Sequence, residues 1–199
     1  MTRKTVSAKL IARVGVLGAI AALLFLIPGI PIVPPIYKLD FSTVPVLLGG
    51  FSLRPVPGLL ILLVKDLVGL TNSSSMGVGE LADFLASAAM MLTAVAIYRR
   101  HHSRRGALIG LIAGTAVMTA AAALINYYIV IPFYVAAMNM PAEAIVSMIG
   151  KVIPAVDSLP KLIAFATTPF NLLKGVVLSV ITFLLYKRLS PLLKGEKKR

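Results

Sequence analysis

The chain has 199 residues, of which 58% are hydrophobic and only 14% are charged, and its mean hydropathy is +0.93. This balance excludes an ordinary soluble domain and is typical of an integral membrane protein. The net charge of +13 does not indicate nucleic-acid binding, because the lysines and arginines lie at the edges of apolar runs instead of covering one polar face.

The N-terminal segment, residues 1–9, is basic and precedes an apolar run, as in a signal peptide. The apolar run continues to Ile27, which is long enough to span a membrane, and no small-residue cleavage site follows it. The pattern therefore predicts a retained first helix.

Six apolar segments predict membrane helices, because a helix needs about 20 such residues to cross the hydrocarbon core. They cover residues 7–27, 42–53, 56–70, 78–98, 107–135 and 161–187, and a basic tail covers residues 187–199. The second and third are too short to cross upright alone, so we expect shifted boundaries or a partly re-entrant hairpin. The sequence thus predicts one domain over residues 1–199, an all-α integral membrane protein with a six-transmembrane-helix bundle.

The basic residues predict the orientation of this bundle. With six spans and both termini in the cytoplasm, 15 of the 20 lysines and arginines fall on the cytoplasmic side, which satisfies the positive-inside rule. These are Arg3, Lys4, Lys9, Arg13, Arg54, Arg99, Arg100, Arg104, Arg105, Lys187, Arg188, Lys194, Lys197, Lys198 and Arg199.

Two long loops are expected on the outer side. Residues 28–40 contain Pro28, Pro31, Pro34 and Pro35, which fix backbone angles and exclude a helix or a central strand. We expect this loop to be a stiff cover over the helices. In residues 138–160, a proline at position 141 followed by apolar residues at helical spacing predicts a short interfacial helix.

Small side chains recur along the first predicted helix. They are Ala8, Ala12, Gly15, Ala19 and Ala22, with Gly18 beside them. Such a seam lets helix backbones approach closely in lipid, either within this chain or on a partner protein, and the residues alone leave both readings open. A second seam, Gly106, Gly110 and Gly114, is interpreted as internal packing.

Asn171 and Lys174 lie three residues apart on one face of the last apolar segment. A lipid-facing lysine would cost roughly 2.5 to 3.5 kcal/mol, so both side chains should face the protein interior. One interpretation is a ligand site. The other is an interhelical ion pair between Lys174 and one of the acids Asp66, Glu80 and Asp83.

Asn126 adds a third polar group near the outer end of the fifth segment. A buried carboxamide needs partners for its donors and its acceptor, and aromatic residues follow it closely. Together with Asn171 and Lys174 it predicts a small-molecule pocket with apolar and aromatic walls.

No catalytic motif is present, so we expect no enzyme activity, no cofactor and no metal site. Glu80 and Asp83 are spaced as a carboxylate pair, which we interpret as structural because further metal ligands are lacking. There is no Walker motif, so an ATPase that drives transport must be another chain.

Five stretches resemble the riboflavin-specific S component, the substrate-binding membrane subunit, of energy-coupling factor (ECF) vitamin transporters. They are residues 38–48, Pro55-Val-Pro-Gly58 with Lys65-Asp66, residues 77–84, Asn126-Tyr-Tyr-Ile129 and Pro169-Phe-Asn-Leu-Leu-Lys-Gly175. The resemblance extends over about residues 11–185, nearly the whole membrane part.

This resemblance implies a multi-pass protein of the prokaryotic plasma membrane that captures riboflavin from outside. It also implies partners, namely one transmembrane coupling protein and two cytoplasmic ATPases, with reorientation of the S component to release the vitamin. The family's Ala-x-x-x-Ala docking motif falls on Gly15 and Ala19, and we expect the docking face to include Gly18 and Ala22.

The family's polar ligand contacts fall on Asn126, Asn171 and Lys174. Asparagine can match the imide edge of the flavin, and lysine can donate to a ring carbonyl or nitrogen. Asp40 is expected to close the loop over the ligand or to cap the following helix. Further candidates for the wall and lid are Leu39, Phe41, Tyr127, Phe133 and Tyr134.

Two other functions remain open from the residues. The first is an S component for another vitamin, although cationic thiamine favours buried acids and anionic pantothenate would suit Lys174 alone. The second is a structural membrane protein in which Lys174 only pairs with an acid, so that its replacement destabilises the fold whether or not a vitamin is present.

Overall fold

The computed structural model describes residues 7–34 and 36–194, with side chains up to residue 188. Five of its helices are long and apolar enough to cross a membrane. They are α1 (Ala8–Leu26), α3 (Pro55–Gly69) extended by the 3₁₀ turn η1 (Leu70–Asn72), α4 (Val78–Arg100), α5 (Arg104–Ile125) continued through η2 (Asn126–Val130) into α6 (Ile131–Ala137), and α8 (Leu159–Leu162) continued through η3 (Ile163–Thr167) into α9 (Thr168–Lys194).

The positions of these helices agree with the predicted apolar segments, and two of them extend further than predicted. The fifth runs from Arg104 to Ala137, and the sixth begins at Leu159. The helix continues beyond its predicted end at residue 187, because the first part of the basic tail is helical to Lys194. Leucine, lysine and arginine are strong helix formers, so the basic residues mark an end of the apolar surface and not an end of the helix.

The short apolar helix α2 (Thr43–Ser52) lies in the centre of the bundle, and all ten of its residues are buried. It packs against α1, α3, α4 and α9. Ten residues of helix are about 15 Å long, which is half of the roughly 30 Å hydrocarbon core. Helix α2 alone is therefore too short to cross a membrane.

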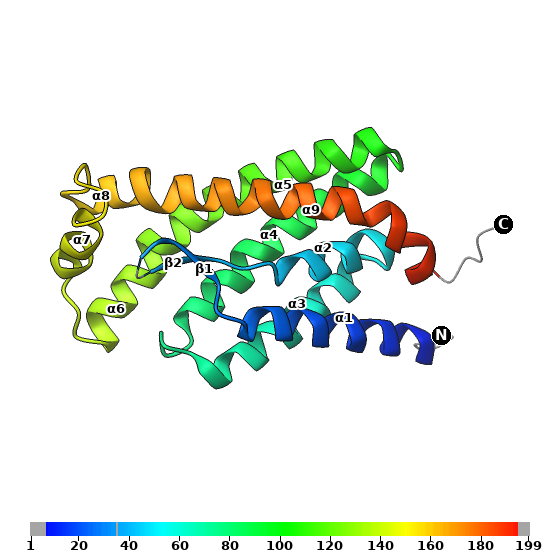
Figure 1. Ribbon diagram of the computed structural model, residues 1–199, viewed down its shortest axis with the longest axis horizontal. Coiled ribbons are helices and arrows are strands. Elements are labelled where there is room, and N and C mark those ends of the chain that lie inside the picture. The colour runs from blue at the N-terminus through cyan, green and yellow to red at the C-terminus, as the bar shows by residue number, and fades with distance from the viewer. Residues whose placement is uncertain (1–6, 35, 195–199) are drawn as a thin grey trace, which may run out of the picture.

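The proline-rich loop before α2 forms an antiparallel hairpin of β1 (Ile30–Val33) and β2 (Tyr37–Leu39). Pro31 lies opposite Lys38. A two-stranded hairpin has only edge strands, where proline is tolerated. Figure 1 places the hairpin in the half of the molecule that also holds α6, α7 and α8. The chain then enters α2, so residues at this junction reach the interior.

The short helix predicted after Pro141 is present as α7 (Ala142–Gly150), and its position at the membrane interface stays a prediction. Its apolar face, Ile145, Val146 and Ile149, is buried in a hydrophobic cluster with residues of β2, α6, α8 and α9. A second and larger cluster joins α1 to α5 and the later part of α9. The molecule thus has two apolar cores, one in each half.

The seam of glycines in α5 packs against α4, as predicted. A Cβ atom at Gly110 would lie 2.6 Å from the carbonyl oxygen of Ala94, and one at Gly114 would lie 2.7 Å from that of Met90. Only a residue without a side chain lets the two backbones approach this closely. The backbones of α4 and α5 are therefore in close contact along this seam.

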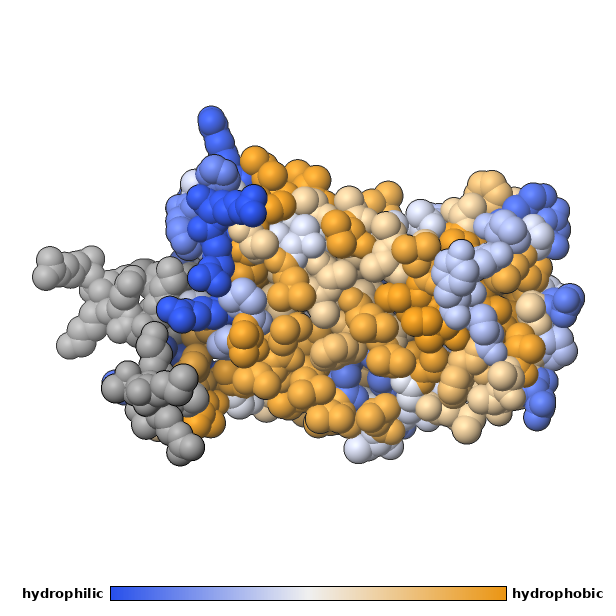
Figure 2. All heavy atoms as spheres, turned by 180° about the vertical axis from the view of Figure 1, so that it is seen from behind, coloured by the Kyte–Doolittle hydropathy of each residue, from blue (hydrophilic) through white to orange (hydrophobic). Residues whose placement is uncertain are grey.

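The two ends of the bundle carry different parts of the chain. α1 begins and α9 ends at the end that also carries the α4–α5 connection (Figure 1). Figure 2 shows a broad apolar surface between two more polar ends, as expected for a protein surrounded by lipid. Of the residues assigned above to the loops and the cytoplasmic side, Arg3, Lys4, Pro35, Lys197, Lys198 and Arg199 lie outside the described residues.

Candidate functional site

A cavity of about 450 Å³ lies between the two apolar cores. Its walls come from the end of α1, the hairpin, the turn before α4, and the facing sides of α4, α5, η2, α6 and α9. Small-molecule pockets in proteins measure about 300 to 1,000 Å³ and combine apolar walls with a few convergent polar groups. Its size and composition therefore suit a small organic ligand.

The three predicted polar anchors, Asn126, Asn171 and Lys174, all line this cavity. Asn171 and Lys174 are buried on α9, and Asn126 is half-buried at the start of η2. The two segments are distant in sequence, and the packing of α5 on α9 brings them together. The prediction that these residues converge on one site rested on helix phase and depth, and the structure places them so.

Each asparagine keeps hydrogen-bonding capacity for a ligand. Asn126 Nδ2 donates to the carbonyl oxygen of Ala122 over 2.8 Å, and Asn171 Nδ2 donates to that of Thr167 over 2.8 Å. Among the described residues, these are the bonds that the two side chains make, so each retains one N–H donor and the amide oxygen. An imide, with a donor between two acceptors, matches such a pair.

Two π-helical turns lie beside these asparagines. Asn126 opens η2, and Asn171 follows η3 by four residues. In an α-helix, four residues make more than one full turn, so side chains four residues apart drift around the helix axis. A π turn contains more residues than an α turn and therefore reduces this drift. Asn126, Val130 and Tyr134 accordingly all line the cavity.

Lys174 is held by two carboxylates inside the bundle. Its Nζ atom lies 2.9 Å from Asp40 Oδ2 and 2.9 Å from Asp83 Oδ1. An ammonium has three donors, so one N–H remains for a ligand. Of the ion pairs that the sequence allowed, the one with Asp83 is present, and Lys174 lines the cavity at the same time. The structural and the ligand-binding roles therefore coexist in this residue.

Asp40 connects the hairpin to α9, and it does not cap α2, whose N-cap residue is Ser42 without a side-chain cap hydrogen bond. Its Oδ1 atom accepts a hydrogen bond from the backbone N–H of Ser42 over 3.0 Å, next to the start of α2, while its Oδ2 atom binds Lys174. The hairpin is thereby tied to α9 through a buried ion pair. Asp40 also lines the cavity, so closure of the loop and organisation of the site depend on one carboxylate.

The ion-pair network continues away from the cavity to α3. Asp83 binds Lys65 through its second oxygen, and Lys65 Nζ lies 2.7 Å from Asp66 Oδ1. Lys65 is fully buried and its Nζ atom also lies 4.2 Å from the centre of the Phe25 ring, which is a cation–π contact. Two ammonium groups and three carboxylates thus connect the hairpin, α3, α4 and α9.

Aromatic rings form part of the cavity wall. The rings of Tyr37 and Phe170 lie 5.1 Å apart, and Phe25 and Tyr134 also line the cavity. The hydroxyl of Tyr37 lies 2.5 Å from Thr167 Oγ1, and burial raises the pKa of Tyr37 to about 12, so the phenol stays neutral. Rings placed in this way can stack on a flat heterocycle.

Several predicted wall residues do not reach the cavity. Tyr134 lines it, whereas Leu39, Phe41, Tyr127 and Phe133 do not. Tyr127 and Phe133 are adjacent in sequence to Asn126 and Tyr134, and one step along a helix turns a side chain by about 100°. The ring of Tyr127 instead lies 4.9 Å from that of Tyr128, whose side chain is 68% exposed.

The sequence did not reveal a second polar wall at the turn before α4. The backbone there takes a left-handed conformation at Gly77, with φ +89°, which lets the turn close. Glu80 Oε2 accepts hydrogen bonds from Ser73 Oγ over 2.8 Å and from Ser75 Oγ over 3.1 Å. Glu80 lines the cavity with Asn72, Ser74 and Ser75. The only sequence signal was the spacing of Glu80 and Asp83.

The small-residue seam of α1 divides between two environments. Gly15 and Ala19 are exposed, and nothing lies within 4 Å of a Cβ atom placed at Gly15. Gly18 and Ala22 are buried, and a Cβ atom at Gly18 would lie 3.1 Å from Val64 Cγ1 of α3. Gly18 therefore packs within this chain, and Gly15 with Ala19 forms the accessible part of the seam.

The model of the family described as "ECF transporter, substrate-specific component" matches residues 9–186. The riboflavin transporter RibU of Staphylococcus aureus is 38% identical over 187 residues, which cover 94% of this chain and 93% of that protein. The riboflavin transporter FmnP of Bacillus subtilis is 28% identical over 192 residues, covering 92% of this chain and 93% of that protein.

A solved structure described as "Structure and mechanism of the S component of a bacterial ECF transporter" is similar in fold as well as in sequence. The TM-score is 0.73 at 38% identity, and the match covers 94% of this chain and 98% of the other. A match of this extent leaves little of either chain outside the shared fold. The chain belongs to the family of substrate-specific components of ECF transporters.

Proposed function

We propose that this chain is the riboflavin-binding membrane subunit of an ECF transporter. The observation that carries the proposal is the convergence of Asn126, Asn171 and Lys174 on one cavity of about 450 Å³. The relatives named riboflavin transporters, which match over most of their length, support the same ligand.

The polar anchors suit the imide edge of the flavin ring. The amide oxygen of one asparagine accepts the imide N–H, while the remaining amide N–H groups and the third N–H of Lys174 donate to ring carbonyls or a ring nitrogen. Tyr37 and Phe170 cover the flat ring, whose apolar part lies along the walls. The ribityl chain extends toward the hydroxyl-rich wall around Ser74 and Ser75.

The charges of the cavity favour a neutral ligand over pantothenate. Lys174 is already neutralised by two carboxylates, so it offers a hydrogen bond but little net positive charge to an anion. Glu80 is the one feature that would favour a cation such as thiamine, because in the described part of the chain no lysine or arginine pairs with it. Thiamine and pantothenate are therefore the competitors to test.

We further propose the membrane arrangement that transport requires. α1, α2, α3, α4, α5 with α6, and α8 with α9 form a six-helix bundle in the plasma membrane, with both termini in the cytoplasm. The shared end of α1, α9 and the α4–α5 connection supports this orientation (Figure 1). The cavity then opens toward the outside, beneath the hairpin.

The proposed partners are one transmembrane coupling protein and two ATPases. Gly15 and Ala19 offer an exposed small-residue face on α1, where another helix can pack closely. The chain supplies the binding site, and the partner module supplies ATP hydrolysis. Release into the cytoplasm then requires reorientation of this subunit against its partners.

The first experiment is a riboflavin titration of the detergent-purified protein, followed by quenching of flavin fluorescence. Asn126→Ala and Asn171→Ala are the informative variants, because each asparagine bonds only to its own helix and its loss breaks no ion pair. Losing one good hydrogen bond costs about 1 kcal/mol or more, so the Kd should rise about fivefold to tenfold.

The matched control is Tyr128→Ala, which removes an exposed side chain close to Asn126 and outside the cavity. Saturable one-to-one quenching by the wild type, weakened in both asparagine variants and unchanged in the control, would support the proposal. If a monodisperse protein free of bound flavin gives no quenching, the riboflavin assignment fails, and thiamine and pantothenate are titrated next by calorimetry.

A further inference from the structure

The connection between α4 and α5 concentrates positive charge at one end of the bundle. Residues 99–105 contain four arginines and two histidines, namely Arg99, Arg100, His101, His102, Arg104 and Arg105. Between Asp83 and Glu143 the sequence has no acidic residue, so the part of α4 that follows Asp83 and the whole of α5 carry no carboxylate to balance this charge. In the described part of the chain, none of these arginines forms an ion pair.

A second hollow, of about 520 Å³, lies at this connection and shares no lining residue with the first cavity. It is lined by Ile97, Arg100, His101, Ser103, Arg105, Gly106 and Ile109. The lining thus combines two isoleucines with two arginines and a histidine. Because Arg100, His101 and Arg105 are exposed, these basic side chains are accessible to a ligand at the membrane surface.

The sequence builds this hollow from both helices. Ile97 and Arg100 are three residues apart on α4, and Arg105 and Ile109 are four apart on α5, so each arginine lies on the same face as an isoleucine. Ile109 is 57% exposed. Gly106 allows the tight turn, because a Cβ atom there would lie 1.9 Å from the carbonyl oxygen of His101.

We propose that this groove binds an anionic phospholipid, with its phosphate on Arg100 and Arg105 and an acyl chain along Ile97 and Ile109. Guanidinium groups bind phosphate through paired hydrogen bonds, and basic pockets beside membrane helices recognise anionic headgroups. The two isoleucines select a lipid over free phosphate, because free phosphate would leave their apolar surface uncovered. With both termini in the cytoplasm, the bound lipid belongs to the inner leaflet. The site itself does not depend on the identity of the vitamin.

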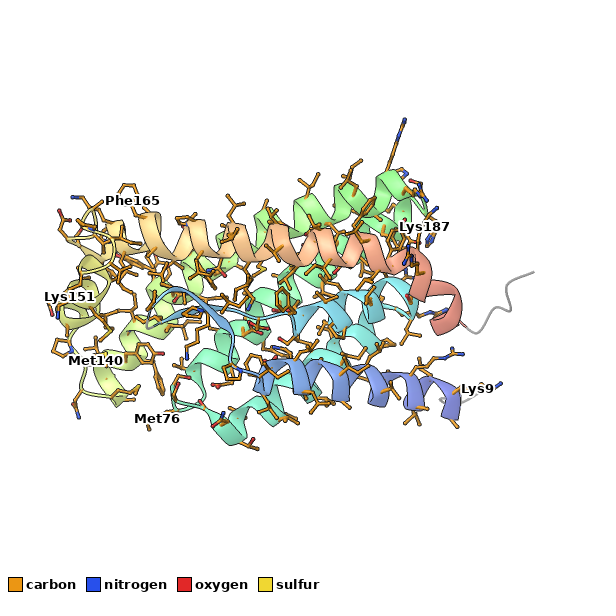
Figure 3. The ribbon with its side chains drawn as sticks, viewed as in Figure 1. Lys9, Met76, Met140, Lys151, Phe165 and Lys187 are labelled. Atoms are coloured by element: carbon orange, nitrogen blue, oxygen red, sulfur yellow. The ribbon has the colours of Figure 1, made fainter. Side chains whose placement is uncertain are left out.

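The test uses the full chain in detergent, without riboflavin. Thermal unfolding is measured with added dioleoyl phosphatidylglycerol, with dioleoyl phosphatidylcholine and with inorganic phosphate, and native mass spectrometry counts the retained lipids. The test variant is Arg100→Gln with Arg105→Gln. The matched control, Lys9→Gln with Lys187→Gln, removes two exposed positive charges from the same end of the molecule, outside the groove (Figure 3).

The expected result is a rise in Tm and one retained lipid with phosphatidylglycerol, a clearly smaller effect with phosphatidylcholine, and none with inorganic phosphate. The arginine variant should weaken retention at least tenfold, while the control retains it. Equal effects of the two lipids, an equal shift by inorganic phosphate, an unaffected arginine variant, or equal losses in both double variants would each overturn the assignment. The last outcome would mean diffuse attraction to the charged end, which requires no groove.

Discussion

Lys174 is the residue on which the packing and the binding chemistry of this protein meet. Its ammonium group lies inside the bundle, 2.9 Å from one carboxylate of the hairpin and 2.9 Å from one of α4, and it still borders the cavity. A buried charge is tolerable only when partners compensate its lost hydration. Any substitution of Lys174 therefore changes the fold and the binding site together, and the two effects must be separated by measurement.

Replacing Lys174 by methionine should destabilise the ligand-free protein by about 3 to 5 kcal/mol, because a carboxylate is left buried without its cation. Asp40 would lose its only lysine partner among the described residues, while Asp83 would keep Lys65. Adding Asp40→Asn to Lys174→Met should restore part of the loss. Denaturant unfolding in detergent gives the free energy of unfolding of the wild type, of Lys174→Met and of the double variant.

Lys161→Ala is the control for that comparison, because it breaks the exposed pair with Asp157 instead of a buried one. Charges in contact with water attract each other weakly, so this substitution should leave unfolding unchanged. If Lys174→Met unfolds like the wild type, the buried network does not stabilise the bundle.

Glu80 should set the preference for neutral over phosphorylated flavin. It lies about one helical turn from Asp83 toward the start of α4, on the side to which the ribityl chain would extend. A phosphate there would approach a carboxylate, and like charges repel. In Glu80→Gln, the ratio of the Kd for flavin mononucleotide to that for riboflavin should fall by about tenfold, or ~1.4 kcal/mol.

Lys38→Gln is the opposite charge change on the wall of the same cavity, and it should raise that ratio. Fluorescence titrations with both flavins give the two constants for each variant. A ratio that stays constant across both variants would mean that neither charge interacts with the phosphate at the end of the ribityl chain.

At the scale of elements, the glycines of α5 allow packing within this chain, whereas Gly15 of α1 does not. Gly110 allows the backbone contact between α4 and α5, whereas Gly15 faces open space. Gly110→Val should therefore force α4 and α5 apart and destabilise the protein by roughly 1 to 3 kcal/mol. Gly15→Val should leave unfolding and riboflavin binding unchanged. Thermal unfolding of the two variants is measured side by side. Equal shifts in their Tm would contradict this assignment.

The exposed small residues of α1 should matter only in the assembled transporter, where a partner helix packs on them. A leucine at Gly15 and at Ala19 would keep a partner helix from close approach, since packing in membranes depends on small residues at the contact. The double variant should bind riboflavin normally in detergent but lose ATP-dependent uptake in cells that carry the coupling module. Normal uptake would place the docking face elsewhere.

At the scale of the whole molecule, the sequence predicted the features that hydropathy and helix phase determine. The positions of the apolar helices, the short helix α7 and the convergence of Asn126, Asn171 and Lys174 all depend on such periodic patterns. The hairpin could not be predicted, because its pairing depends on the turn between residues 33 and 37 and not on an alternating pattern. The wall at Glu80 was missed because it depends on a left-handed turn at Gly77.

The wall residues show why phase fails locally. An α-helical count from Asn126 did not distinguish Phe133 from Tyr134, because the π turn at Asn126–Val130 shifts the faces of α6 relative to α5. Tyr127 was a candidate only as an aromatic neighbour of Asn126. Nothing in the composition of that segment distinguishes a π turn from an α turn. Polar residues were predicted better than aromatic ones, because a buried polar group must face the interior whereas an aromatic ring can also face lipid.

The orientation of the bundle leads to the final prediction, which the absence of cysteine makes simple to test. Lys151 and Lys187 are exposed and lie at opposite ends of the molecule (Figure 3). With both termini in the cytoplasm, a membrane-impermeant maleimide added to intact cells should label Lys151→Cys and leave Lys187→Cys unlabelled. After the cells are opened, both variants should react. Labelling of Lys187→Cys alone in intact cells would show that the bundle has the opposite orientation. The cavity would then receive its ligand from the cytoplasmic side.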